Sequence, residues 1–262
     1  MTAADQPGAT ILLVGCGRMG SAMAAAWAPA FRVLVHDPHA APPPDTEQVR
    51  ALGGIEADIV VLAVKPQVFP DAAPALMQLA GDPLFLSIMA GLSLAGLSAA
   101  LGGTRRLVRA MPNTPAAIGR GITAAVADRD VSDGECRLVE RLLRATGALV
   151  WLDREADLDA VTAVSGSGPA YFFRFAEALA RAGEQAGLDP ALAMQLARAT
   201  FSGAAALADQ RPEPLSTLRQ EVTSPGGTTA AGLSALDADG AIDRLVGDVV
   251  QRAASRSREL GG

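Results

Sequence analysis

The chain has 262 residues, half of them hydrophobic and 19% charged, so it can bury a sizeable core in one large domain or two modest ones. Its formal net charge of -6, with no basic run longer than Arg105 and Arg106, indicates a small ligand and excludes nucleic acid as the expected partner. Its only cysteines, Cys16 and Cys136, do not form a disulfide pattern, which favours a reducing cytoplasm.

The sequence predicts no membrane segment. The start, "MTAADQPGATILLVG", lacks the basic region and the apolar run of a signal peptide. Residues 83–104 carry no charge and are long enough to span a bilayer, so a membrane helix is the alternative there. Pro83 and the sequence "LFLSI", followed by a break at Gly91, instead indicate a buried strand that leaves its sheet.

From residue 10 to about 150, short apolar runs alternate with helical patterns. The runs are "TILLV", "FRVLVH", "DIVVLAV", "LFLSI", "RRLVRA", "ITAAV" and "ALVWL", and the clearest helical patterns are "MGSAMAAAWA", "VFPDAAPALMQLA" and "SDGECRLVERLLRAT". This alternation predicts an α/β fold, with a Rossmann-type, doubly wound and mostly parallel sheet covered on both faces.

Beyond "WLDRE" the strand patterns cease, and the remaining segments carry apolar residues at helical spacing. We therefore predict a dinucleotide-binding domain over residues 1–154 and an all-helical domain for substrate binding and oligomerisation over 155–262. The alanine-rich stripes of the second domain offer more apolar faces than one small bundle needs, so we expect a dimer or a larger assembly.

The segment "ILLVGCGRMGSAMAAAW" places a strand, a GxGxxG loop and a helix in the order of a dinucleotide site. Gly15 permits the tight turn, Gly17 lets the backbone approach a pyrophosphate, and Gly20 allows close helix packing. The amino end of the helix then faces the anion. An ordinary tight turn is the alternative.

Asp37 ends the run "RVLVHD", where a carboxylate can accept hydrogen bonds from the adenosine ribose and repel a 2′-phosphate. This favours NADH. Asp37 could also be a plain turn residue before Pro38, and His36, His39 and Arg50 offer positive charge nearby, so the cofactor preference stays open.

Two further segments follow predicted strands, at the sheet edge where α/β proteins bind ligands. "VKPQ" (64–67) contains Lys65, the only lysine of the chain, which we expect to contact cofactor rather than to be a solvated surface residue. "AMPNTP" (110–115) holds Asn113 and Thr114 between prolines, so an amide there can face a nicotinamide. A plain proline-rich turn is the alternative.

The helical half offers no obvious proton donor for carbonyl reduction. Both histidines and Lys65 lie in the nucleotide half, and the only tyrosine, Tyr171, has no lysine four residues on. No cluster of His, Cys and Asp has metal-ligand spacing, so no metal is expected. The remaining chemistry is hydride transfer to an acceptor that is already cationic, such as a protonated cyclic imine.

A second glycine loop, "TSPGGTT" (223–229), precedes a predicted helix. Its backbone N–H groups can hold a carboxylate, Gly226 and Gly227 allow close approach, and the hydroxyls of Thr228 and Thr229 can bond an iminium or amine. A turn with a threonine cap is the alternative. "SGSGP" (165–169) predicts a helix interruption, either for packing or for approach of a cofactor.

Together, "GCGRMG", "VLAVKPQ", "SIMAG", "RAMPNTP", "DAVTAVSGSGPAYFF" and "TSPGGTTAAGL" resemble the pyrroline-5-carboxylate reductase family over nearly the whole chain. The resemblance implies reduction of Δ1-pyrroline-5-carboxylate to L-proline, the last step of proline biosynthesis, by NADPH or NADH. It also implies a helical dimerisation domain and, in many members, a pentamer of dimers.

The resemblance and the loops assign roles by position. Cofactor binding falls to Gly15, Cys16, Gly17, Arg18, Met19, Gly20, Asp37, Ala63, Val64, Lys65, Pro66, Asn113 and Thr114. Substrate binding falls to Ser224, Gly226, Gly227, Thr228 and Thr229, with the Thr229 hydroxyl as the catalytic group at the ring nitrogen. The segment before the loop is longer than in the family, so no acidic substrate contact is transferred to Asp209 or Glu213.

Two other functions stay open. A β-hydroxyacid dehydrogenase would need a lysine that the helical half lacks. A nucleotide-sensing or scaffolding protein would bind cofactor without substrate-dependent oxidation, and retention of "SPGGTT" argues against it.

Overall fold

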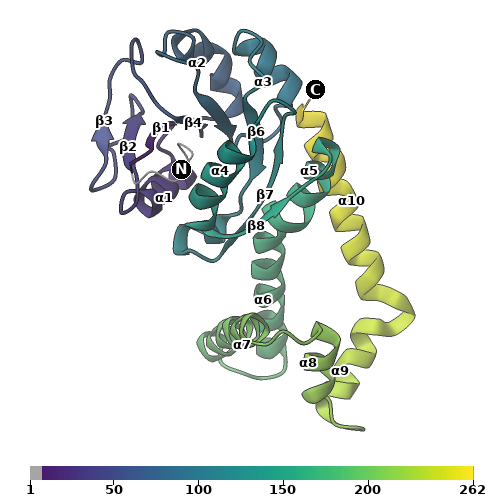
Figure 1. Ribbon diagram of the computed structural model, residues 1–262. Coiled ribbons are helices and arrows are strands. Elements are labelled where there is room, and N and C mark those ends of the chain that lie inside the picture. Colours follow the sequence, from purple (N-terminus) through teal and green to yellow (C-terminus); the bar gives the residue numbers. More distant parts are fainter. Residues whose placement is uncertain (1–7, 262) are drawn as a thin grey trace. The chain divides into compact units, whose positions relative to one another are not determined.

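The computed structural model describes residues 8–261, which form two compact units (Figure 1). The first comprises the described residues up to Ser167 together with those from Ala253 onward, and the second is Gly168–Arg252. The predicted domain boundary between residues 154 and 155 stays a prediction.

The first unit is built on one eight-stranded sheet in the order β3-β2-β1-β4-β5-β6-β7-β8. Its strands are β1 (Thr10–Val14), β2 (Arg32–His36), β3 (Glu47–Gln48), β4 (Ile59–Leu62), β5 (Leu84–Ser87), β6 (Leu107–Met111), β7 (Gly121–Ala127) and β8 (Gly147–Trp151). All neighbouring strands are parallel except β6 and β7, which confirms the predicted mostly parallel sheet. The sequence did not predict the short β3 or the antiparallel pair, whose connection is too short for a parallel crossover.

Helices cover both faces of this sheet (Figure 1). They are α1 (Arg18–Trp27), α2 (Phe69–Leu76), α3 (Leu94–Ala100), α4 (Asp133–Arg144) and α5 (Leu158–Val161). In β1, Ile11 and Leu13 point into the core shared with α1 and α4, whereas Leu12 and Val14 point into the core shared with α2 and α3. Because both faces are buried, the strands are continuous apolar runs rather than alternating ones.

Residues 83–104 form β5 and α3, with Leu84–Ser87 buried, as the buried-strand prediction requires. None of the helices in the described part of the chain is long and apolar enough to cross a membrane.

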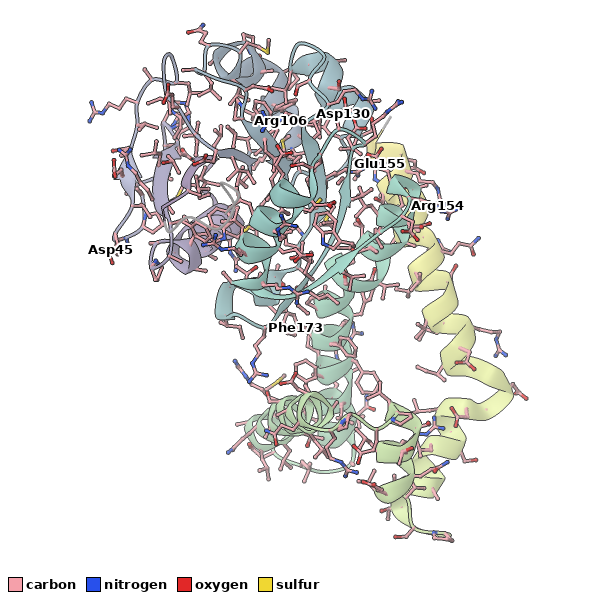
Figure 2. The ribbon with its side chains drawn as sticks, in the orientation of Figure 1. Asp45, Arg106, Asp130, Arg154, Glu155 and Phe173 are labelled. Atoms are coloured by element: carbon pink, nitrogen blue, oxygen red, sulfur yellow. The ribbon has the colours of Figure 1, made fainter. Side chains whose placement is uncertain are left out.

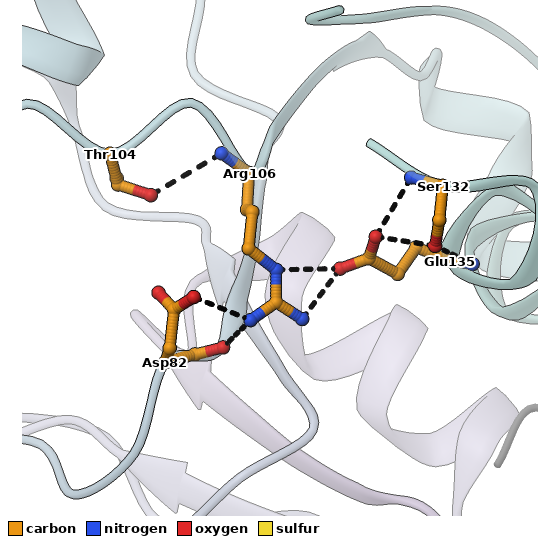
Figure 3. A network of polar contacts seen from close by, with 5 residues as sticks. All are labelled: Asp82, Thr104, Arg106, Ser132 and Glu135. Atoms are coloured by element: carbon orange, nitrogen blue, oxygen red, sulfur yellow. Dashed lines mark hydrogen bonds and ion pairs between the residues drawn. The ribbon is translucent and has the colours of Figure 1, made fainter. Parts of the chain in front are cut away.

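An ion-pair network joins the start of β6 to the start of α4 (Figure 3). Arg106 contacts Glu135 through Nε at 2.8 Å and Asp82 through Nη1 at 2.8 Å. Glu135 also accepts from the Ser132 N–H while the Ser132 hydroxyl accepts from the Glu135 N–H, so a capping box begins α4. Burial opposes the charge of Glu135, but the bonds from Ser132 and Arg106 outweigh it and lower the pKa of this carboxyl.

We expect Glu135→Gln to lower the free energy of unfolding at pH 7 by about 1–2 kcal/mol, because the amide can still cap α4 but cannot pair with Arg106. Because folding lowers the pKa of Glu135, its ionised form stabilises the folded protein at pH values above the ordinary pKa of a glutamate. This stabilisation is lost as the pH falls through the pKa of Glu135 in the folded state. Urea unfolding at pH 7 and pH 3 should therefore show the difference from the parent shrinking in acid. Asp133→Asn, which removes a charge from the same turn but keeps the Arg106 contact, is the control. A difference independent of pH would contradict the expectation.

The second unit contains α6 (Gly168–Gln185), α7 (Pro190–Gln210), α8 (Leu215–Glu221) and α9 (Thr228–Asp237). The long helix α10 (Ala241–Gly261) begins in this unit and its last turns belong to the first. α6 and α7 form a hairpin in which Gly183 lies against Ala193, because a Cβ on Gly183 would stand 3.3 Å from that of Ala193. The prediction of a mostly helical second half is confirmed.

Candidate active site

The strand register places the ends of three neighbouring strands in one row. Val14 of β1 is paired with His36 of β2 and with Leu62 of β4. The residues that follow, Gly15, Asp37 and Ala63, therefore lie together at the carboxyl edge of the sheet, where α/β proteins bind nucleotides.

Each glycine of the first loop has the geometry that its motif predicts. Gly15 has φ +99°, and a Cβ there would lie 2.7 Å from the Ala63 carbonyl carbon and the Val64 nitrogen. A Cβ on Gly20 would lie 2.2 Å from the Gly15 oxygen, so α1 packs directly on the loop. Gly17 begins α1 without a side-chain cap and has open space around it. The first N–H groups of α1 are thus available to an anion such as a pyrophosphate.

Asp37 is bound to the glycine loop itself. One carboxylate oxygen accepts from the Cys16 N–H at 2.7 Å, and the other accepts from the N–H groups of His39 and Ala40 at 2.8 and 3.0 Å. Burial opposes the charge, but these bonds and the nearby His39 outweigh it and lower the pKa of the Asp37 carboxyl. Burial and then the Asp37 charge raise the pKa of the Cys16 thiol, which therefore stays neutral beside the anion site.

The sequence did not predict these structural bonds of Asp37. A carboxylate has about four acceptor positions, and three are occupied by backbone N–H groups. One acceptor position remains, so Asp37 shapes the loop and could still accept from a ribose hydroxyl, a role that stays a prediction.

The segment after β4 lies against the same loop. Ala63 donates its N–H to Val14 at 2.8 Å and, with Val64, lines the close approach to Gly15. Lys65 is exposed and precedes the 3-10 helix Pro66–Val68. These positions fit the predicted cofactor contacts, and their role stays a prediction.

The structure gives Asn113 a bracing position in the loop after β6. Its side-chain oxygen accepts from the Ile122 N–H of β7 at 2.9 Å, and its amide nitrogen donates to the Ser165 carbonyl at 3.2 Å. The side chain is buried, whereas Thr114 next to it is exposed. Both polar atoms of the Asn113 amide are therefore engaged within the protein, and a nicotinamide contact by Asn113 or Thr114 stays a prediction.

The Ser165 carbonyl belongs to a single π-helical turn, Thr162–Gly166, that precedes α6. The predicted helix interruption at "SGSGP" is therefore present. Such turns are frequent at functional sites.

An ion pair between a buried arginine and a half-buried glutamate was not predicted from the sequence. Arg109 of β6 donates to Glu155 at 2.8 Å, and the same oxygen accepts from the Leu94 N–H at the start of α3 (Glu155 is labelled in Figure 2). Arg109 Nε has no partner within residues 8–261. The available signal was a charged residue inside an otherwise apolar strand, which requires a partner when buried.

The late glycine loop lies in the second unit and leads directly into α9. The Gly227 N–H donates to the Ser224 carbonyl at 3.0 Å, and Gly226 has φ +70°, so the turn uses a conformation that favours glycine. Gly227 begins α9 without a side-chain cap, and Ser224, Thr228 and Thr229 are exposed. The first N–H groups of α9 and these three hydroxyls are therefore available to a small anionic molecule.

No group of three or more His, Cys, Asp or Glu within the described part of the chain could hold a metal. A mostly parallel sheet with an open glycine loop at the end of its first strand, followed by a helical unit whose glycine turn leads into an uncapped helix, is typical of a nicotinamide-dependent oxidoreductase.

Comparison with known proteins narrows this class. Residues 155–260 match the family described as "pyrroline-5-carboxylate reductase dimerisation". Residues 10–91 match a second family, described as "NADP oxidoreductase coenzyme F420-dependent". The chain is 40% identical to the pyrroline-5-carboxylate reductase of Pseudomonas aeruginosa, over 95% of this chain and 96% of that one. It is 36% identical to that of Haemophilus influenzae, over 88% and 89% of the two chains. The chain belongs to the pyrroline-5-carboxylate reductase family.

Solved structures of pyrroline-5-carboxylate reductases have the same fold as this chain. A pyrroline-5-carboxylate reductase from Coxiella burnetii superposes with a TM-score of 0.88 at 31% identity, covering 97% of this chain and 99% of that one. A pyrroline carboxylate reductase from Plasmodium falciparum, solved with NADP bound, has a TM-score of 0.83 at 28% identity, covering 97% and 98%. A ketol-acid reductoisomerase from an uncultured archaean, at 13% identity and a TM-score of 0.63, shares only the fold.

Proposed function

We propose that the protein reduces Δ1-pyrroline-5-carboxylate to L-proline with a reduced nicotinamide cofactor. The observation that carries this proposal is the open turn at Ser224–Gly227 leading into the uncapped start of α9, in a chain that also has a dinucleotide loop. Such a turn suits the carboxylate of a small imino acid, and membership of the family supports this substrate.

The chemistry needs no proton donor from the helical unit. A bound reduced nicotinamide would supply a hydride to the imine carbon, and because the ring nitrogen would already be protonated, the C=N electron pair would move to nitrogen without a further proton from the protein. One NAD(P)H, one proton and one imino acid give NAD(P)⁺ and proline. The protein's part is to orient the reacting carbons about 3–3.5 Å apart and to bond the charged groups.

In this proposal the exposed hydroxyl of Thr229 accepts a hydrogen bond from the ring N–H while the backbone of the turn holds the carboxylate. Ser224, Gly226, Gly227 and Thr228 form that carboxylate site. The glycine loop and the ends of β4 and β6 hold the cofactor.

Both nicotinamides remain candidates as cofactor. The NADP-bound relative supports NADPH, whereas the charge of Asp37 at the ribose position supports NADH. The cytoplasm, where the free cysteines Cys16 and Cys136 stay reduced, is the proposed location.

The match to the dimerisation family supports self-association of the chain. Large apolar side chains on the helical unit remain uncovered, with Phe172 62% and Phe173 56% exposed (Phe173 is labelled in Figure 2). Faces of this kind are typical of subunit interfaces. We propose a dimer that assembles further into a pentamer of dimers, which light scattering at several concentrations tests through the measured mass.

The test of the reaction is the loss of reduced-nicotinamide absorbance on adding pyrroline-5-carboxylate, run with NADPH and NADH, with proline identified as the product. Turnover that needs the imino acid supports the proposal. Folded protein that binds nucleotide but turns over neither cofactor contradicts it, and leaves a nucleotide sensor or a reductase of another imino acid.

A further inference from the structure

Arg211, between α7 and α8, binds two carboxylates at once. Its Nε and Nη2 donate to Glu213 at 3.2 and 2.9 Å, and its Nη1 and Nη2 donate to Glu221 at 2.7 and 2.9 Å. Four of the five N–H groups of the guanidinium are thus used, in two bidentate pairs. We call Arg211, Glu213 and Glu221 the Arg211 clamp.

One arm of the clamp is attached to a stiff segment. Glu213 lies between Pro212 and Pro214, which fix the backbone φ on either side of it. The Pro214 carbonyl accepts from the Thr217 N–H at 2.8 Å, so the segment is also held to the first turn of α8. Little chain entropy is lost when Glu213 meets Arg211, since its position is already restricted.

The other arm leads to the substrate turn. Glu221 is the last residue of α8, and the Thr223 hydroxyl donates to the Arg219 carbonyl in that last turn at 2.6 Å. The Gly227 N–H then donates to the Ser224 carbonyl at 3.0 Å, one residue before α9 begins. Continuous contacts therefore run from the clamp to the anion-binding start of α9.

We propose that Arg211 is a positioning residue that holds the substrate-carboxylate loop, residues 223–229, in its binding geometry through Glu221 and α8. The role in substrate binding rests on the function proposed above. Arg211 does not itself bind the substrate carboxylate, because Glu213 and Glu221 already accept hydrogen bonds from four of its five guanidinium N–H groups.

The charges of the clamp are consistent with this role. The hydrogen bonds to Arg211 lower the pKa of Glu213 and that of Glu221, so both stay ionised at neutral pH. The carboxylates are partly exposed, and such pairs add little to global stability. The effect of the clamp is therefore expected in the geometry of the loop rather than in the melting temperature.

The experiment compares Arg211→Gln with Arg252→Gln in the full chain. Arg252 pairs with Asp248 on α10 at 2.8 Å, so its variant removes a surface ion pair from the same unit without touching the loop. We expect Arg211→Gln to raise the KM for pyrroline-5-carboxylate about three- to tenfold, with kcat and the KM for the nicotinamide cofactor unchanged. Arg211→Lys, which cannot form the bidentate pairs, should show part of this rise.

Hydrogen–deuterium exchange gives a readout that needs no substrate. The amides of residues 223–229 should exchange faster in Arg211→Gln than in the parent, and at the parent rate in Arg252→Gln. The proposal is overturned if Arg211→Gln keeps the parent KM and exchange, or if it alters both KM values together with the melting temperature. If the parent does not turn over the imino acid, the proposed function fails and the exchange rates alone test the clamp.

Discussion

Thr229→Val should lower kcat/KM for pyrroline-5-carboxylate about ten- to a hundredfold, equivalent to roughly 1.4–2.7 kcal/mol of transition-state stabilisation. Valine has nearly the same shape but cannot bond to the ring nitrogen. Cofactor affinity should not change, because Thr229 is not among the residues predicted to contact the cofactor. Steady-state kinetics and nucleotide binding measure the two quantities separately.

The position of Thr229 explains the size of this effect. It is the second residue of α9, in the first turn, where backbone N–H groups have no intrahelical partner. A molecule whose carboxylate binds these groups has its ring close to the hydroxyls of the same turn. One lost hydrogen bond to a charged group in this setting costs more than one between neutral groups.

Thr229→Ser is the matched control, since it keeps the hydroxyl and removes only a methyl group. It should retain most of the parent kcat/KM. If the valine variant has the parent's kinetics, or if the serine variant falls as far as the valine variant, Thr229 does not act through its hydroxyl.

Asp37→Ser should shift the ratio of kcat/KM for NADPH over NADH toward NADPH by about tenfold or more, because it removes a fixed negative charge from the predicted ribose site. The geometry adds a second effect. The carboxylate also accepts from the Cys16 N–H at 2.7 Å, a bond that the shorter serine cannot keep while holding the turn at His39. We therefore expect kcat/KM with NADH to fall outright, and not only relative to NADPH.

Asp45→Asn is the control for loss of charge on the loop that follows (Asp45 is labelled in Figure 2). Asp45 is exposed and has φ +61°, a conformation that asparagine tolerates, so this variant changes charge without straining the backbone. It should keep the parent ratio of cofactors. An Asp37→Ser enzyme that also kept that ratio would show that Asp37 does not select the cofactor.

Much of the fold was predictable because its signals are local. Strand and helix periods follow from a few consecutive residues, and the apolar run of β1 is buried on both faces as its composition predicts. The antiparallel β7 was not predictable in this way, since the direction of a strand depends on the length and path of the connection before it.

In the candidate site, too, the local features were predictable and the contacts between distant residues were not. The spacing of Gly15, Gly17 and Gly20 specified a turn, an open backbone and a close packing contact, and the structure shows all three. What the sequence could not show is that Asp37 reaches the Cys16 N–H and that the amide of Asn113 turns to Ser165. An aspartate or an asparagine would stand at these positions whether it contacted a ligand or braced the protein, so the residue type alone does not distinguish the two roles.

The sequence by itself determined most of the strands and helices along the chain, the glycine loops and the family, because these depend on local periodicity and on motifs of adjacent residues. Only the tertiary structure decided the partners of the polar side chains, such as Glu155 for Arg109, 46 positions apart. A buried charge requires a partner, but the identity of that partner depends on which distant segments the packed sheet brings together.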